Sequence, residues 1–180
     1  ATVLNGVITG VSAGTANIYY SVTTNGCTKA VAATVTVNAL PTVSPITGTT
    51  SVCVGSTTSL SNPSSAGTWS SSNTSVATVL NGVVTGVSAG TATIFYAITT
   101  NGCTKTVSVT VTVNPLPTVN AITGTLSVCV GSTTTLNSTT PGGTWSSSNT
   151  SVATVLNGVI TGVSAGTANI YYSVTTNGCT

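Results

Sequence analysis

The sequence predicts an all-β fold made of tandem seven-stranded β-sandwiches, each 76 residues long. Trp69 and Trp145 are 76 residues apart, and the same interval separates Cys53 from Cys129. Within that interval, short segments rich in Val, Ile and Thr alternate with Gly, Pro and Asn, a pattern typical of strands joined by turns. No stretch of useful length has the periodicity of an amphipathic helix, so the prediction contains no helix.

The 76-residue period divides the chain into three units. Cys27, Cys103 and Cys179 recur at this interval, and segments 38–41 and 114–117 contain the prolines of two predicted linkers. Proline ends strand pairing and stiffens a joint. We therefore predict the C-terminal part of a repeat at 1–41, a complete repeat at 42–117, and a repeat lacking most of its last strand at 118–180. Both termini fall inside repeats, so we expect a segment of a longer chain.

The repeats also suggest a longer cycle. Residues 1–28 are identical to residues 153–180, whereas the intervening copy, 77–104, differs from them at five positions. We therefore hypothesise that two types of repeat alternate, with a super-period of 152 residues.

Seven strands are predicted in the complete repeat, at 43–54 (interrupted near Gly48), 57–60, 68–70, 76–80, 83–87, 91–99 and 103–113. Asn81-Gly82 and Asn101-Gly102 predict tight hairpin turns, because both central positions of such turns need a positive φ. Seven short strands in a domain of this length indicate two packed antiparallel sheets.

The alternation of side chains predicts which face of each strand is buried. In 103–113, four valines point one way and the threonines point the other. In 91–99, positions 93, 95 and 97 change polarity between repeats, so we expect the alternate positions Ala92, Ile94, Tyr96 and Ile98 to face the core. Trp69 and its counterpart Trp145 are expected in that core.

One aromatic ring per repeat is then predicted to face outward, at Tyr19, Phe95 and Tyr171. Single exposed aromatic side chains are common on protein surfaces. Their regular spacing makes these three the candidate lateral contacts with a neighbouring chain.

The composition excludes most chemistry. The chain has no Asp, Glu or His, and Lys29 and Lys105 are its only charged side chains. General acid–base catalysis, an activated nucleophile and a calcium site all need the missing groups, and a thiolate zinc site needs more Cys than one repeat has. We therefore predict no enzyme activity, no cofactor and no metal site.

The same composition limits the partners. A net charge of +2 is too small to favour nucleic acid or an anionic membrane surface, and apolar runs of only a few residues predict no membrane insertion. A nearly uncharged surface favours self-association. We therefore expect the chain to pack along or beside copies of itself.

The segment from Trp69 to Val79 (WSSSNTSVATV), followed by 81–94 (NGVVTGVSAGTATI), closely resembles bacterial immunoglobulin-like domains of group 2. The added motifs around Cys53 (VCVG) and Cys103 (NGC) resemble repeats of very large secreted surface proteins of the Bacteroidetes type. The resemblance implies an immunoglobulin-like β-sandwich that acts as a spacer in extracellular adhesins or cell-surface filaments. It implies no catalytic residue.

Two cysteines per repeat in a secreted chain predict disulfides. Pairing within a repeat, Cys53–Cys103 and Cys129–Cys179, resembles the Cys–Trp–Cys order of immunoglobulin domains. However, Cys53 and Cys103 are predicted at opposite ends of a strand roughly 33 Å long, whereas a disulfide needs Cα atoms within about 7 Å.

A second pairing joins Cys53 to Cys179 across the junction between consecutive repeats. Cys27 and Cys103 would then pair with cysteines upstream, and Cys129 with one downstream. Disulfides between chains are a third alternative, and free buried thiols a fourth.

The predicted function is structural. We expect a repeat segment of a long extracellular fibre, filament or adhesin stalk, in which stacked sandwiches, short proline linkers and disulfides provide length and stiffness. The alternative is an adhesive module that recognises a surface glycan or protein, because the loop at 61–67 differs in most residues from its counterpart at 137–143.

Overall fold

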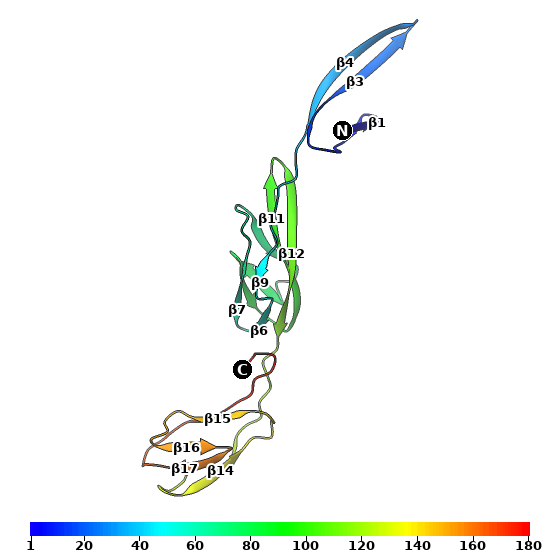
Figure 1. The fold of residues 1–180 in the computed structure, drawn as a ribbon. Coiled ribbons are helices and arrows are strands. Elements are labelled where there is room, and N and C mark those ends of the chain that lie inside the picture. The colour runs from blue at the N-terminus through cyan, green and yellow to red at the C-terminus, as the bar shows by residue number, and fades with distance from the viewer.

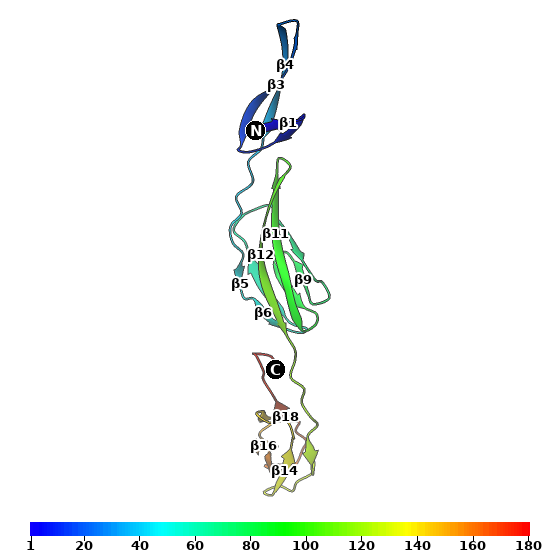
Figure 2. The same cartoon turned by 90° about the vertical axis from the view of Figure 1, so that its right-hand side faces the viewer.

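The computed structural model describes all 180 residues as an elongated all-β chain without helices. Three groups of strands follow one another along its length, with the N-terminal strands at one end and the C-terminal sheets at the other (Figures 1 and 2). No helix is long and apolar enough to cross a membrane. The all-β fold predicted from the sequence is therefore confirmed.

The middle group forms two four-stranded sheets. One has the order β5-β7-β10-β9 and the other β6-β12-β11-β8. Their bounds are β5 Thr47–Gly48, β6 Ser51–Cys53, β7 Thr57–Ser61, β8 Thr68–Ser71, β9 Ala77–Leu80, β10 Val83–Gly86, β11 Gly90–Thr100 and β12 Cys103–Asn114. Both predicted Asn-Gly turns are present, with φ of 50° at Asn81 and 49° at Asn101. Each turn joins antiparallel neighbours, as its sequence requires.

The predicted first strand differs most from the structure. Segment 43–46 is not a strand, and β5 and β6 lie in different sheets, because β5 pairs with β7 while β6 runs parallel to β12. Gly48 has a φ of 126°, and a Cβ there would lie 2.4 Å from the Ser59 carbonyl oxygen. Only glycine fits this position, so the chain can leave one sheet here and join the other.

One core cluster joins the two sheets. Both contribute to its eight buried residues: Val52, Leu60, Ala77, Val84, Ala92, Ile94, Val111 and Val113. The predicted inward face of β11 is confirmed, since Ala92, Ile94, Tyr96 and Ile98 are buried. In β12, the valines at 111 and 113 are buried and the intervening Thr112 is exposed. Burying these side chains drives the two sheets together.

The C-terminal group repeats this arrangement without the last strand. It contains β13 Thr123–Gly124, β14 Thr133–Asn137, β15 Thr144–Ser147, β16 Ala153–Leu156, β17 Val159–Gly162 and β18 Ile170–Ser173. The sheet β13-β14-β17-β16 matches its counterpart in the middle group, but the second sheet is reduced to β15 and β18. Its core cluster has only three buried residues, Leu136, Ala153 and Ile160.

The N-terminal group consists of two hairpins. They are formed by β1 Thr2–Leu4 with β2 Val7–Thr9, and by β3 Gly14–Thr24 with β4 Cys27–Val37. Tyr20 is 70% exposed there, whereas its counterpart Tyr96 is 5% exposed in the middle group. The predicted boundaries after Pro41 and Pro117 lie in the strand-free segments 38–46 and 115–122.

We predict that Ile94→Ala lowers the free energy of unfolding of the middle group by about 2–5 kcal/mol, because Ile94 is fully buried and the change leaves a cavity. Thr110→Ala, on the exposed face of β12, is the matched control and should change it by less than about 0.5 kcal/mol. Both changes in the free energy of unfolding are measured by urea unfolding in a Trp145→Phe background, with Trp69 fluorescence as the signal. Equal midpoints for the two variants would contradict the assigned core.

Candidate functional site at the junction between repeats

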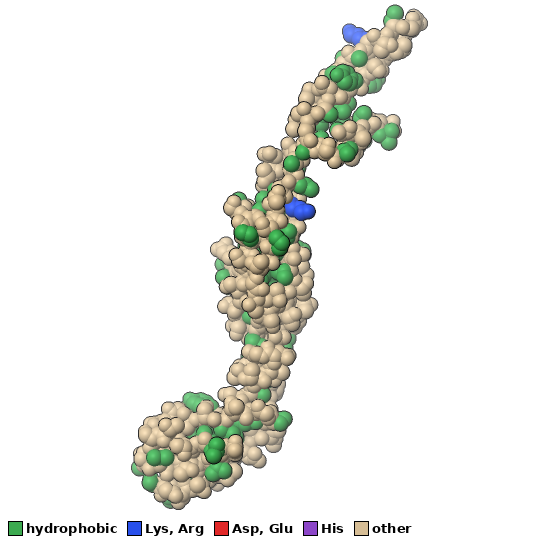
Figure 3. All heavy atoms as spheres, viewed as in Figure 1, with side chains coloured by type: hydrophobic (Ala, Val, Ile, Leu, Met, Phe, Trp, Pro, Cys, Tyr) green, Lys and Arg blue, Asp and Glu red, His purple; other side chains and the backbone are tan.

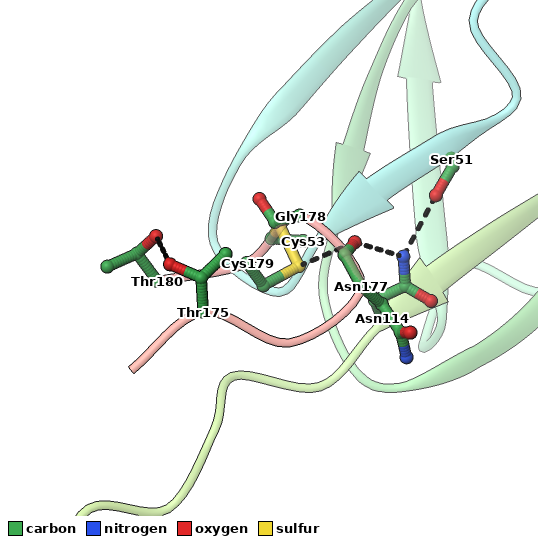
Figure 4. The surroundings of a disulfide bond; sticks show 8 residues. All are labelled: Ser51, Cys53, Asn114, Thr175, Asn177, Gly178, Cys179 and Thr180. Carbon is green, nitrogen blue, oxygen red and sulfur yellow. Dashed lines mark hydrogen bonds between the residues drawn. A yellow bond between two sulfur atoms is a disulfide. The ribbon is translucent and has the colours of Figure 1, made fainter. Parts of the chain in front are cut away.

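The structure forms one disulfide, between Cys53 and Cys179, with a Cα–Cα distance of 5.6 Å and a sequence separation of 126 residues. Cys53 ends β6 in the middle group, whereas Cys179 lies in the turn that follows β18 in the C-terminal group. Figure 4 shows the two sulfur atoms meeting where the C-terminal turn returns to the end of the middle group. This is the pairing across the junction.

Both pairs within a repeat are absent, because Cys53 and Cys179 are bonded to each other. Cys53 and Cys103 cannot reach each other because they lie at opposite ends of β12. Cys103 begins this strand, while Cys53 lies beside Asn114 at its end. Eleven residues at about 3.3 Å each separate the two ends by roughly 36 Å. Cys27, Cys103 and Cys129 are free, with Cys27 and Cys129 exposed and Cys103 half-buried.

An asparagine contact accompanies the disulfide. Asn114, the last residue of β12, donates through Nδ2 to the carbonyl oxygen of Asn177 at 3.4 Å and to Ser51 Oγ at 2.9 Å. The turn at Asn177-Gly178 is therefore held by one hydrogen bond and one covalent bond to the same end of the middle group (Figure 4).

The same contact recurs one repeat earlier. Asn38 Nδ2 donates to the carbonyl oxygen of Asn101 at 2.9 Å, and both residues lie 76 positions before Asn114 and Asn177. Cys103, the counterpart of Cys179, lies with its Sγ 3.7 Å from the carbonyl oxygen of Asn38. The two junctions thus share one geometry, in which the turn of each repeat contacts the end of the preceding one.

The incoming linker is fixed at a second point. In the middle group, the Ser44 N–H donates to Ser64 Oγ at 2.9 Å, and Asn62 Nδ2 donates to the Ser44 carbonyl oxygen at 2.6 Å. Tyr96 anchors this loop, because its hydroxyl donates to the Ser64 carbonyl oxygen and accepts from the Gly67 N–H. Segment 38–44 is therefore tied to one unit at both ends.

The loop with the changed sequence makes equivalent bonds in the C-terminal group. There the Asn120 N–H donates to Thr140 Oγ1 at 2.8 Å, and Ser138 Oγ donates to the Asn120 carbonyl oxygen at 3.3 Å. Ser44, Asn62 and Ser64 correspond to Asn120, Ser138 and Thr140 one repeat later. The side chain differs at all three positions, but the same backbone and side-chain groups donate and accept the two hydrogen bonds. The sequence analysis did not predict these linker contacts. A signal for them exists, because the linker and the loop both change when the second repeat is compared with the third.

The predicted aromatic positions lie away from the junction. Trp69 and Trp145 are half-buried at the edge of their clusters, each with its ring centroid 4.8 Å from a tyrosine, Tyr96 or Tyr172. The tryptophans therefore cover the core rather than fill it. Tyr19 is 66% exposed and Tyr171 50% exposed, whereas Phe95 is half-buried between its cross-strand neighbours Ser70 and Ser108. Their role as lateral contacts stays a prediction.

The side chains at the junction are neutral. Figure 3 shows blue Lys and Arg side chains but no red or purple side chains on its face of the molecule, in agreement with a sequence that has two lysines and no Asp, Glu or His. No group of three or more His, Cys, Asp and Glu side chains is placed to hold a metal ion. What the arrangement can do chemically is form disulfides and neutral hydrogen bonds.

Comparison with known proteins gives no family assignment. No family model matches the chain, and no curated protein is significantly similar. Domains 4 and 5 of the S-layer protein SbsC are 20% identical, with a TM-score of 0.34, covering 74% of this chain and 94% of theirs. Domains 1–6 of SbsC are 18% identical with a TM-score of 0.33, over 91% of this chain and 34% of theirs. This chain therefore spans about a third of that six-domain structure, and similarity at this level identifies no function.

We predict that trypsin digestion of the unreduced chain in urea yields two fragments that stay linked by a disulfide. Lys29 and Lys105 are the only cleavage sites, so Cys53 lies in fragment 30–105 and Cys179 in fragment 106–180. The disulfide should hold these two fragments together until a reductant is added, and further cleavage with chymotrypsin should place the link at Cys53 and Cys179. A link within fragment 30–105, between Cys53 and Cys103, would contradict the junction pairing.

Proposed function

We propose that this chain is a structural repeat segment of an extracellular, cell-surface fibre, filament or adhesin stalk, built from immunoglobulin-like sandwiches of the group 2 type, and that it provides length and stiffness. The observation that carries the proposal is the junction. Its contacts recur at the 76-residue interval, and in one of the two junctions they include a covalent bond. Such contacts limit the rotation of each unit against the next, which is what a stiff spacer needs.

The disulfide supports a mechanical role because of what it connects. It closes a loop between residues 126 positions apart in two different groups of strands, and the chain-entropy estimate for such a loop is about 5 kcal/mol. A tensile force on the chain would be carried by this bond in parallel with the linker at 115–122. Because disulfides persist in oxidising surroundings, the bond also supports the proposed extracellular location.

The alternative, an adhesive module that recognises a glycan or protein through the loop at 61–67, has less support. Two of the polar side chains of this loop, Asn62 and Ser64, bind the incoming linker at Ser44. At these two positions the exchange of side chains between repeats keeps the bonds to the linker, so the variation there needs no ligand.

We predict that Cys53→Ser/Cys179→Ser loosens the junction between the middle and C-terminal groups. NMR relaxation should show both groups tumbling as one body in the oxidised chain and with separate correlation times in the variant, and small-angle scattering should show a broader distance distribution. Cys27→Ser is the matched control, because Cys27 is free and lies outside both junctions. Independent tumbling in the oxidised wild-type chain would refute the stiff-spacer proposal.

A further inference from the structure

An apolar patch is exposed on the hairpin of β9 and β10 in the middle group. The only large apolar side chains exposed between residues 42 and 114 belong to this hairpin or directly follow it, namely Leu80, Val83 and Val87. β9 is an outermost strand of its sheet, and Figure 2 shows it at the flank of the group, on the side away from β5. The patch is therefore open to solvent although the middle group has a neighbouring group of strands at each end.

The same patch recurs in the other two groups. Leu4, Leu80 and Leu156 follow one another at the 76-residue interval and are 75%, 74% and 74% exposed. The counterparts of the two valines are exposed as well, at Val7, Val11, Val159 and Val163. The three groups differ in their number of strands, yet the exposure of the leucine is the same. The patch is therefore a property of the hairpin itself and not of the strands around it.

The patch combines a projecting side chain with a hollow. Leu80 opposes Val83 across the hairpin, on either side of the Asn81-Gly82 turn. Both line a shallow hollow of about 400 Å³, together with Thr78, Val79, Asn81 and Thr85. Contacts between identical faces are reciprocal, so a second copy related by a two-fold axis can place its leucine in this hollow while it receives the leucine of the first.

The charge of the patch also fits a second copy. When identical faces meet, a charge on one face repels the same charge on the other. None of the residues that line the hollow is charged. Lys29 and Lys105, the only charged side chains, lie on β4 and β12, which belong to other sheets than β9 and β10. Two copies can therefore approach through this face without electrostatic repulsion.

We propose that copies of this chain associate side by side through the β9–β10 hairpin, with Leu80 and Val83 of one copy packed against the same patch of the second. The equivalent hairpins of the other groups make the same contact. Removal of apolar surface from water drives the association, and because each patch is small, several patches must act together for a firm contact. The hairpin lies in the sheet opposite β11, so this contact differs from the predicted one at Tyr19, Phe95 and Tyr171.

The inference rests on the proposed function and deepens it, because it makes the fibre an assembly of several chains. The two can fail separately, since stiffness at the junction belongs to a single chain and is measured at low concentration. A chain that tumbles as one body but never associates would refute the side-by-side contact and leave the stiff spacer standing. Association of a chain whose groups tumble independently would refute only the stiff spacer.

The first test is sedimentation equilibrium of the full 180-residue chain at concentrations up to about 1 mM, where weak association becomes measurable. All samples carry Cys27→Ser/Cys103→Ser/Cys129→Ser, so that free thiols cannot join the copies while the Cys53–Cys179 disulfide stays intact. The average mass of this parent chain should rise with concentration.

A pair of matched variants tests the patch. Leu4→Lys/Leu80→Lys/Leu156→Lys places like charges face to face and should weaken the association at least about tenfold. Thr15→Lys/Thr91→Lys/Thr167→Lys adds the same three charges at exposed positions with the same spacing, and Thr91 lies on β11 in the other sheet. This control should associate as the parent chain does. Urea unfolding followed by tryptophan fluorescence checks that both variants are folded.

Cysteines introduced at the same positions locate the contact without adding charge. In the parent background, Leu4→Cys/Leu80→Cys/Leu156→Cys should form dimers with oxidised glutathione, because two successive thiol–disulfide exchanges join the facing thiols and release two small thiols. Thr15→Cys/Thr91→Cys/Thr167→Cys should stay monomeric on a denaturing gel without reductant. A parent chain that stays monomeric, equal association of the two lysine variants, or equal dimer yields of the two cysteine variants would overturn the proposal.

Discussion

The pairing of β11 with β12 is the interaction on which the rest of the molecule depends. Its register runs without interruption from Gly90 opposite Val113 to Thr100 opposite Cys103. One end of this hairpin contributes Val111 and Val113 to the core, and the other carries Asn101 and Cys103 to the preceding unit. The second junction uses the same turn, since Asn177 and Cys179 of the C-terminal group contact the end of β12 and β6 in the middle group.

Much of this arrangement could be predicted from the sequence because it follows from strand geometry. Alternating valines fix the faces of β12, Asn-Gly fixes its turn, and strand length alone separates Cys53 from Cys103. Two features could not be predicted. The division of the first strand between two sheets depends on a close approach of Gly48 to Ser59, and the partial burial of Phe95 depends on its neighbours across the sheet. Both are tertiary contacts without a local sequence signal.

The near absence of charge determines which forces hold the units together. Ionised carboxylates and histidines commonly give proteins their pH dependence, and this chain has neither. The junction uses amide and hydroxyl hydrogen bonds, whose strength depends little on salt because no ion pair is involved. Neutral bonds of this kind contribute only about 1 kcal/mol each. A stiff junction therefore needs several of them together with a covalent bond.

The linker contacts supply a physical basis for the hypothesis of a two-repeat cycle. Ser44 is matched to Asn62 and Ser64 in one unit, and Asn120 is matched to Ser138 and Thr140 in the next. A change in the linker is thus accompanied by a change in the loop that holds it, so each linker suits the unit that follows it. Neither the linker residues nor the loop residues belong to a core cluster, so the matched change concerns the junction. The linker contacts thus differ between the two units, whereas the Asn38–Asn101 and Asn114–Asn177 bonds are common to both junctions.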